Sequence, residues 1–125
     1  MIIYCVRHGK TNMNELGVYN GLIDEDINDI GIMLAEELKN DMFNIDYDVV
    51  YCSPMIRAKH TCDIINVKNI KPIYDDRLKE RTLGMLDGKD FIKEGLDFED
   101  FLNYNYKSDD PTFEDLPTLF KRVHN

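Results

Sequence analysis

An arginine and a histidine stand side by side near the start of the chain, in the stretch MIIYCVRHGKTNMN. The apolar run before them is typical of a buried strand, so Arg7 and His8 mark the point where that strand ends. A protein core stabilises such polar groups only when it supplies partners for them. The pair therefore indicates a bound anion at this strand end, with Thr11 and Asn14 just behind it.

A second polar group follows the next predicted strand. Ser53 and Pro54 come directly after residues 48–52 and predict an N-cap and a first helical position, from which a helix runs to about Asn66. Arg57 falls in the first turns of that helix. Helix N-termini favour anions, and a guanidinium group matches phosphate oxygens with two parallel hydrogen bonds. The two groups together predict a site for a phosphoryl group.

A histidine between arginines suits phosphoryl transfer. A neutral imidazole can attack phosphorus and later release it, while the guanidinium groups neutralise the charge that gathers on the transferring oxygens. The leaving oxygen also needs a proton. Glu80, which comes soon after the third predicted strand, is the candidate proton donor.

Strands and helices alternate along the chain. A helix begins near Ile30, with Asn28 or Asp29 as its cap, and its apolar positions are Ile30, Met33, Leu34 and Leu38. Further helices are expected within residues 98–104 and from Leu116 onward, with turns at Gly84 and Gly88. The predicted strands are residues 2–6, 48–52 and 70–74. This order predicts an α/β fold with a parallel sheet, in which ligands bind beyond the carboxyl ends of the strands.

Length and composition limit the function classes. A chain of 125 residues with 43% hydrophobic content has the size of a single domain, residues 1–125. The net charge of −9 argues against a nucleic acid or an anionic membrane as the main partner. Three cysteines without metal-type spacing indicate free thiols, and no stretch of about 20 apolar residues is present. We expect a cytoplasmic protein that binds no metal ion and no cofactor.

Several motifs in a fixed order resemble those of the histidine phosphatase superfamily, which includes the cofactor-dependent phosphoglycerate mutases. Arg7-His8-Gly9-Lys10-Thr11 with Asn14 resembles its RHGxT-x-x-N signature, and the stretch from Ser53 to Thr61 resembles its SPxxRAxxT helix start. Further matches are Leu78-Lys79-Glu80 with Gly84 and Gly88, the loop from Asn20-Gly21 to Gly31, and the spacing from Glu114 to Arg122.

The resemblance implies a three-layer sandwich, with helices on both faces of a mostly parallel sheet, and a role for each matching residue. His8 is the expected phosphorylated nucleophile and Glu80 the expected acid or base. The other implied roles are phosphate binding by Arg7, Arg57 and Asn14, support of the loop by Thr11, and a substrate loop of Asn20, Gly21 and Arg81. The implied partner is a small phosphorylated substrate.

The resemblance also implies that family members continue past this length, to a strand with a second histidine. His124 does not lie in such a strand and so does not match the second histidine. We therefore expect that the chain is a truncated member of the family and that it can lack catalytic activity on its own. If residues 2–6 pair with residues 49–52, their other edge is exposed and invites self-association. We favour phosphomonoester hydrolysis, because Leu83 stands where the mutases have a tyrosine. The alternatives are a mutase-type phosphotransferase, a phosphate-binding remnant without turnover and, more weakly, a nucleotide-binding module.

Overall fold

The computed structural model describes residues 1–95 and 98–125. The chain divides into two compact units. The first unit contains Met1–Asn12 and Asp24–Asp76, and the second contains Met13–Ile23 and Arg77–Asn125. Each unit therefore joins two stretches that are separated in the sequence.

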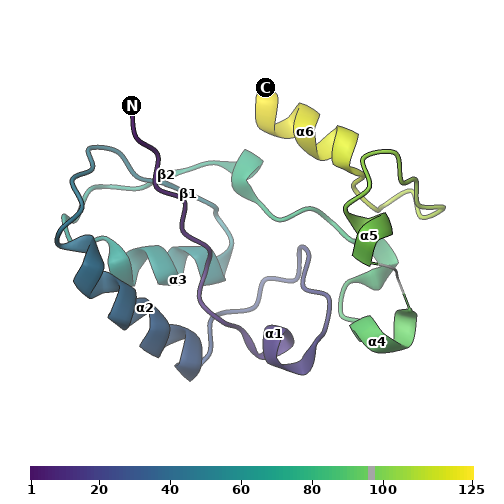
Figure 1. Ribbon diagram of the computed structural model, residues 1–125, viewed down its shortest axis with the longest axis horizontal. Helices are drawn as coiled ribbons and strands as arrows, with labels where there is room; N and C mark the ends of the chain where they lie inside the picture. Colours follow the sequence, from purple (N-terminus) through teal and green to yellow (C-terminus); the bar gives the residue numbers. More distant parts are fainter. Residues whose placement is uncertain (96–97) are drawn as a thin grey trace. The chain divides into compact units, whose positions relative to one another are not determined.

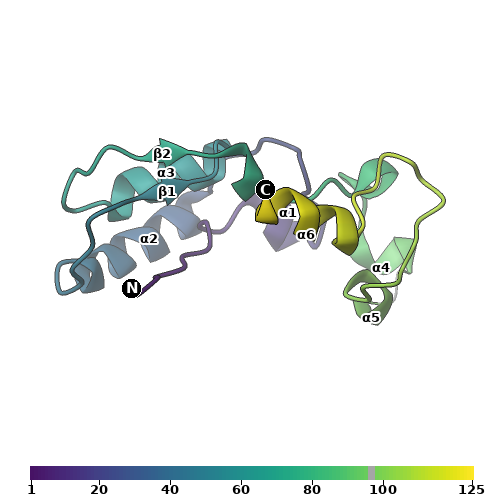
Figure 2. The ribbon, with the colours of Figure 1, turned by 90° about the horizontal axis from the view of Figure 1, so that it is seen from above.

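The first unit carries a β-α-β arrangement (Figure 1). Strand β1 (Tyr51–Cys52) pairs in parallel with β2 (Ile73–Tyr74), and α3 (Ile56–Ile65) connects them. The longest helix, α2 (Asp29–Met42), packs against α3, as Figures 1 and 2 both show. A parallel pair joined by a helical crossover confirms the expected α/β class.

Helix α2 begins where the sequence predicts, but of its four predicted apolar positions only Leu38 packs against the core. The side chain of Asn28 accepts a hydrogen bond from the amide of Gly31, which confirms Asn28 as the N-cap. The core contacts come from Ala35 and Met42, which meet Ile65 of α3. The expected apolar positions Ile30, Met33 and Leu34 are exposed. The small residues Gly31 and Ala35 on the buried side of α2 permit a closer approach to its neighbours. The spacing of large apolar residues in the sequence did not reveal this side.

The predicted strand at residues 2–6 is wrong for this structure. Residues 1–10 form no strand, and within the described part of the chain β1 pairs with β2 rather than with this segment. Ile2 and Ile3 are 77% and 70% exposed. A strand is stabilised by hydrogen bonds to a neighbour, so an apolar run alone does not create one. The apolar surface of this segment consequently faces solvent.

The second unit consists of short elements. These are α1 (Asn12–Leu16), η1 (Asp76–Leu78), η2 (Gly84–Leu86), α4 (Phe91–Glu94), α5 (Phe98–Phe101) and α6 (Leu116–His124). Helix α1 and the helical turn η1 each begin one residue before the stretch of the second unit in which they lie. Helices α5 and α6 lie where helices are predicted, whereas α1 and α4 are too short to show helical periodicity in the sequence. Gly84 and Gly88 have φ angles of +61° and +84°, which confirms the two predicted turns.

Aromatic side chains contact one another in the second unit. The ring of Tyr19 lies 4.3 Å from that of Phe91 and 6.1 Å from that of Phe101, centroid to centroid. Phe113 contacts both Phe101 and Tyr106. These ring contacts hold together a unit in which the longest of the described helices has nine residues.

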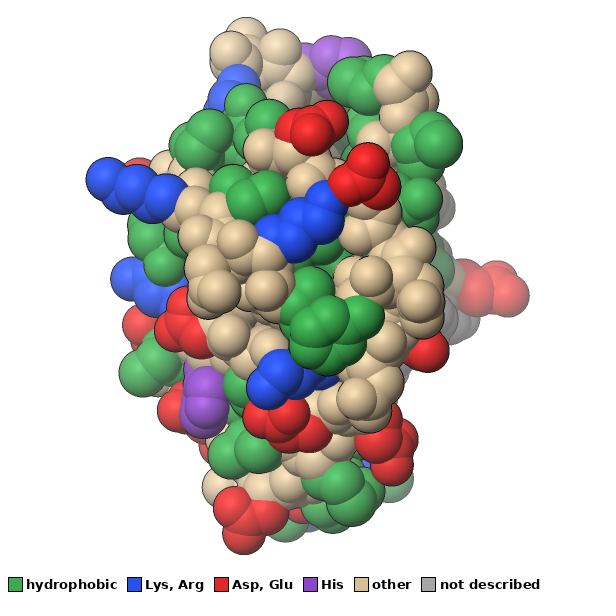
Figure 3. Space-filling model, turned by 90° about the vertical axis from the view of Figure 1, so that its left-hand side faces the viewer, with side chains coloured by type: hydrophobic (Ala, Val, Ile, Leu, Met, Phe, Trp, Pro, Cys, Tyr) green, Lys and Arg blue, Asp and Glu red, His purple; other side chains and the backbone are tan. Residues whose placement is uncertain are grey.

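The surface carries mixed charges. On the face shown in Figure 3, acidic side chains are spread among hydrophobic and basic ones, and the basic side chains form no broad patch. Of the helices described, none has both the length and the apolar character that crossing a bilayer requires.

Candidate functional site

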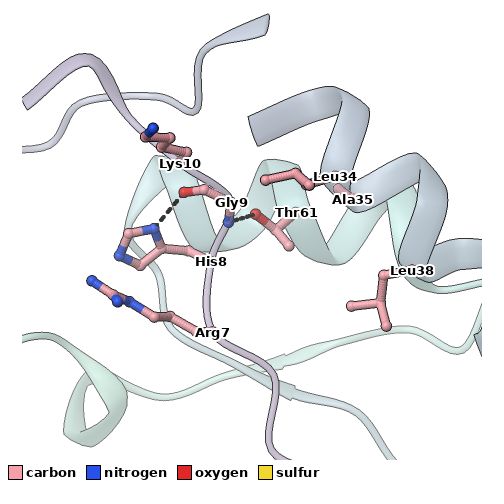
Figure 4. A pocket seen from close by; sticks show the side chains of 8 residues that line it. All are labelled: Arg7, His8, Gly9, Lys10, Leu34, Ala35, Leu38 and Thr61. Atoms are coloured by element: carbon pink, nitrogen blue, oxygen red, sulfur yellow. Dashed lines mark hydrogen bonds between the residues drawn. The ribbon is translucent and has the colours of Figure 1, made fainter. Parts of the chain in front are cut away.

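His8 lies in the loop that follows the exposed N-terminal segment. Its Nδ1 lies 2.7 Å from the carbonyl oxygen of Gly9 (Figure 4). A carbonyl oxygen can only accept a hydrogen bond, so Nδ1 carries the proton and, in the neutral ring, Nε2 carries the lone pair. The loop thus fixes a tautomer in which Nε2 is the nucleophilic nitrogen.

Helix α3 anchors this loop through a residue that the sequence analysis gave no role. The amide of Gly9 donates to Oγ1 of Thr61 at 2.8 Å, and this hydroxyl donates in turn to the carbonyl of Arg57 at 2.7 Å. Thr61 is 4% exposed and Arg57 is 2% exposed. The signal for Thr61 was present, since a threonine four residues after an arginine in a helix can bond back to that residue's carbonyl. The chain of bonds ties the His8 loop to the helix that carries Arg57.

Gly9 of the same loop and Gly31 of α2 approach each other closely and join the loop to the helix. A Cβ on Gly31 would lie 2.3 Å from the carbonyl oxygen of Lys10 and 2.7 Å from its amide nitrogen. The amide of Asn28 donates to that carbonyl at 2.8 Å. Thr11, the predicted loop support, is completely buried and bridges to Ile27. The start of α2 is therefore packed directly on the backbone beside His8.

A hollow of about 160 Å³ opens beside this loop. Arg7 and His8 project to one side of the chain trace in Figure 4, and α2 contributes apolar side chains on the other. The hollow is lined by Arg7, His8, Gly9, Lys10, Leu34, Ala35, Leu38 and Thr61.

The predicted anion site at the start of α3 needs a correction. The helix begins at Ile56 rather than at Ser53-Pro54, and its N-cap is Met55, which makes no side-chain cap bond. The amide of Ile56 donates instead to the carboxylate of Asp24 at 2.7 Å. A carboxylate satisfies an exposed helix amide as a phosphate would. Asp24 therefore occupies the position at which the sequence predicted an anion.

Two predicted site residues lie together in the second unit. Glu80 is exposed, and its Oε1 accepts from the amide of Arg81 at 2.9 Å. Arg81 is 4% exposed, with its guanidinium carbon 3.7 Å from the ring centroid of Phe101 and Nη2 donating to the carbonyl of the same residue at 2.8 Å. Burial lowers the pKa of Arg81. The charged guanidinium group of Arg81 is therefore buried against the ring of Phe101.

The other predicted residues of this unit are Asn14, Asn20 and Gly21. Asn14 lies in α1, where its carbonyl accepts from Gly17. The amide of Gly21 donates to Asp87 Oδ1 at 2.8 Å, and a Cβ at Gly21 would lie 2.3 Å from that oxygen. Asp87, which holds the Asn20-Gly21 loop, was missed by the sequence analysis. Its only signal was a carboxylate between the two turn glycines.

Metal binding finds no support in the described residues. Among them, no three histidine, cysteine, aspartate or glutamate side chains gather into a group that could hold a metal ion.

Comparison with known proteins decides the family. The model of the histidine phosphatase superfamily (branch 1) matches residues 3–125. The chain belongs to this superfamily. Phosphoserine phosphatase 1 of Hydrogenobacter thermophilus is 31% identical over 94% of this chain and 58% of its own length. A 2,3-bisphosphoglycerate-dependent phosphoglycerate mutase of Rhizobium etli is 34% identical over 66% of this chain and 42% of its own length.

Solved structures of the histidine phosphatase superfamily share the fold. The crystal structure of a phosphoglycerate mutase from Thermus thermophilus superposes with a TM-score of 0.73 and 26% identity, over 94% of this chain and 66% of that chain. The phosphoglycerate mutase-like fold predicted from the motifs is therefore confirmed. The chain spans less than two thirds of the length of the curated relatives it matches.

Proposed function

We propose that the protein hydrolyses small phosphomonoesters through a phosphohistidine formed on His8. The observation that carries this proposal is the bond from His8 Nδ1 to the carbonyl of Gly9, which leaves Nε2 as the attacking atom. The anchoring of Gly9 to Thr61 supports it, because a nucleophile must be held within a few tenths of an ångström of its attack position. Arg7, Arg57 and Asn14 bind the phosphoryl oxygens, and Thr11 supports the loop.

The reaction has two steps. In the first, Nε2 of His8 forms a bond to phosphorus as the ester P–O bond breaks, and the carboxyl group of Glu80 gives a proton to the leaving oxygen. In the second, a water oxygen attacks the phosphohistidine, its proton passes to the Glu80 carboxylate, and the P–N bond breaks. The products are an alcohol and inorganic phosphate, and both catalytic groups return to their starting forms.

The proposed substrates are small phosphorylated hydroxy acids. The relatives named above are one phosphoserine phosphatase and two phosphoglycerate mutases, and both names describe compounds of this kind. The burial of Arg81 against Phe101 argues against its predicted place in the substrate loop. Asn20 and Gly21 remain the candidate substrate loop.

Replacement of His8 tests the proposal. In the protein expressed from its own gene, His8→Ala should abolish release of phosphate from p-nitrophenyl phosphate and from phosphoserine, and should remove an acid-labile phosphoenzyme. Lys71→Ala, which removes an exposed cation of the same unit, is the control and should leave both signals intact. Turnover retained by His8→Ala would exclude His8 as the nucleophile. Phosphate binding without any turnover would favour the remnant, and transfer between phosphoglycerates would favour the mutase.

Two broader properties complete the proposal. We place the protein in the cytoplasm, because Cys5, Cys52 and Cys62 are all free thiols, which suit a reducing compartment. We also propose that the 125-residue chain self-associates through its exposed N-terminal segment, residues 1–6. The apolar side chains of this segment are among the most exposed of the molecule.

A further inference from the structure

The side chain of Arg122 makes four hydrogen bonds within the second unit. Its Nε and Nη2 donate to the two carboxylate oxygens of Glu114, each at 2.7 Å. Its Nη1 donates to the carbonyl oxygens of Arg77 at 2.8 Å and Lys79 at 3.1 Å. The guanidinium group of Arg122 on α6 is thus hydrogen-bonded to the backbone directly before Glu80.

The partner carboxylate is attached to the chain directly after Glu80. The amide of Glu114 donates to the carbonyl oxygen of Thr82 at 2.9 Å, and Leu83 bridges to Phe113 in an antiparallel contact. The pair of Arg122 and Glu114 is therefore bonded to the backbone on both sides of Glu80. A short segment held at both ends has few conformations left.

The ion pair itself is well suited to a fixed position. The side chains of Arg122 and Glu114 are 24% and 11% exposed, so solvent screens their attraction less than it would at the surface. The hydrogen bonds that Arg122 donates to Glu114, with smaller contributions from the charges of Glu114 and Glu80, raise the pKa of Arg122, so the guanidinium stays charged. Lysine has no planar fork and could not reach both carboxylate oxygens and both carbonyls.

We propose that Arg122 is a positioning residue for Glu80, holding the backbone so that the Glu80 carboxyl group can deliver its proton to the leaving oxygen. The inference rests on the proposed function, in which Glu80 is the proton donor. Arg122 acts through the segment 77–82 rather than on the substrate. Its loss should therefore impair the first step for an ester whose leaving oxygen needs a proton, and affect that step much less for an ester whose leaving group departs as an anion.

The choice of leaving group separates these steps. p-Nitrophenolate leaves without a proton, whereas the alkoxide of phosphoserine needs one, and general acid catalysis contributes about 10²–10⁴-fold. In the protein expressed from its own gene, E80Q should lower kcat/KM for phosphoserine far more than for p-nitrophenyl phosphate, because kcat/KM reports only the steps up to the phosphohistidine and not its hydrolysis, which both esters share. R122M should show the same selectivity with a smaller loss, about tenfold on phosphoserine, and R122K should not restore activity.

Two further variants and a measurement that needs no turnover distinguish a loss of positioning from a variant that fails to fold. E114Q keeps the size of the partner and should reproduce the R122M selectivity in weaker form. K121M removes an exposed cation from the same helix, next to Arg122, and is the matched control. Hydrogen exchange of the Arg81 amide, which is bonded to Glu80, should quicken in R122M and not in K121M.

The outcomes separate the inference from the function on which it rests. A leaving-group effect in E80Q that is absent from folded R122M and E114Q would overturn the inference alone, as would unchanged exchange of the Arg81 amide in R122M. No leaving-group effect in E80Q, or no turnover of either ester, would overturn the proposed function and the inference together.

Discussion

At the scale of single residues, the guanidinium of Arg57 stands out because the residue is only 2% exposed. A hydrogen bond to a charged group contributes about 1.5–3 kcal/mol when solvent does not compete, and each 1.4 kcal/mol corresponds to a tenfold change in affinity. Arg57→Ala should therefore weaken phosphate or vanadate binding at least about tenfold. Arg57→Lys should restore little, because an ammonium group cannot bind two oxygens in parallel.

Calorimetric titration with vanadate measures this effect, alongside a melting curve that reports any loss of stability. Lys71→Ala, which removes an exposed cation from the same unit, should leave affinity unchanged. An equal affinity in the wild type and in folded Arg57→Ala would remove Arg57 from the phosphate site.

The types of the candidate catalytic residues could be predicted from the sequence, but their connections could not. His8, Arg57 and Glu80 follow from the motifs. The tautomer of His8 depends on the position of one carbonyl oxygen, and the role of Thr61 depends on a bond that spans 52 residues. Such contacts depend on tertiary packing, which local patterns do not encode. The burial of Arg81 was hidden for the same reason, because its aromatic neighbours come from distant segments.

At the scale of elements, Gly31 decides how closely α2 approaches the His8 loop. Alanine normally favours a helix over glycine by about 1 kcal/mol. At this position its Cβ would lie 2.3 Å from the backbone oxygen of Lys10, and backbone cannot move aside as a flexible side chain can. Gly31→Ala should therefore destabilise the protein by about 1–3 kcal/mol, the usual cost of overpacking. Urea unfolding measures the change.

Gly95→Ala is the matched control for this prediction. Its φ is +59° and an added Cβ would meet nothing within 4 Å, so it reports backbone strain alone. A Gly31→Ala variant as stable as the wild type would show that the loop and the helix can separate at little cost.

Helix α6 should respond to acid through its N-cap. Asp115 pairs with Lys107 and accepts from the amide of Thr118 at 2.9 Å, and these bonds, the one from Lys107 foremost, lower its pKa to about 2 from the ordinary 3.8. Because the folded pKa is the lower one, the stabilisation is fully present above about pH 4 and is lost as the pH falls through about 2. The difference in melting temperature between the wild type and Asp115→Asn should therefore shrink as the pH falls from 5 towards 2.

The comparison with Asp115→Asn isolates this one carboxylate, because asparagine remains a good N-cap and every other acid titrates in both proteins. A melting difference that stays constant across this range would contradict the assignment.

Long helices were predicted better than strands, and the physical cause lies in the range of their interactions. Helices α2 and α3 carry their hydrogen bonds within the segment, so the sequence located both. The strands shorten to Tyr51–Cys52 and Ile73–Tyr74 because each needs a neighbour from elsewhere in the chain. Residues 2–6 have the composition of a strand but no neighbour among the described residues. Asp24, which replaces the expected cap of α3, is likewise a distant partner.

At the scale of the whole molecule, residues 1–6 predict the behaviour of the 125-residue chain in solution. Ile2, Ile3, Tyr4 and Val6 are between 44% and 77% exposed, and an apolar extended segment invites pairing with another chain. Light scattering should give a mass above the 14.7 kDa of one chain, and turnover of p-nitrophenyl phosphate should be negligible. Ile3→Lys should reduce the mass, whereas Met85→Lys, at an exposed residue of the second unit, should not.

A compact monomer that melts cooperatively would contradict the association. Turnover by this chain that His8→Ala abolishes would show that the described residues suffice for catalysis.

The interleaving of the two units along the sequence bears on how the chain is made. Both stretches of the first unit have been synthesised once residue 76 has left the ribosome, whereas residues 13–23 must wait for residues 77–125 before the second unit can form. The first unit can therefore fold during translation with residues 13–23 looped out between its two stretches. The chain passes between the units three times, so a protease that cuts once, at any of these passages, would leave each unit still tied to the other by peptide bonds.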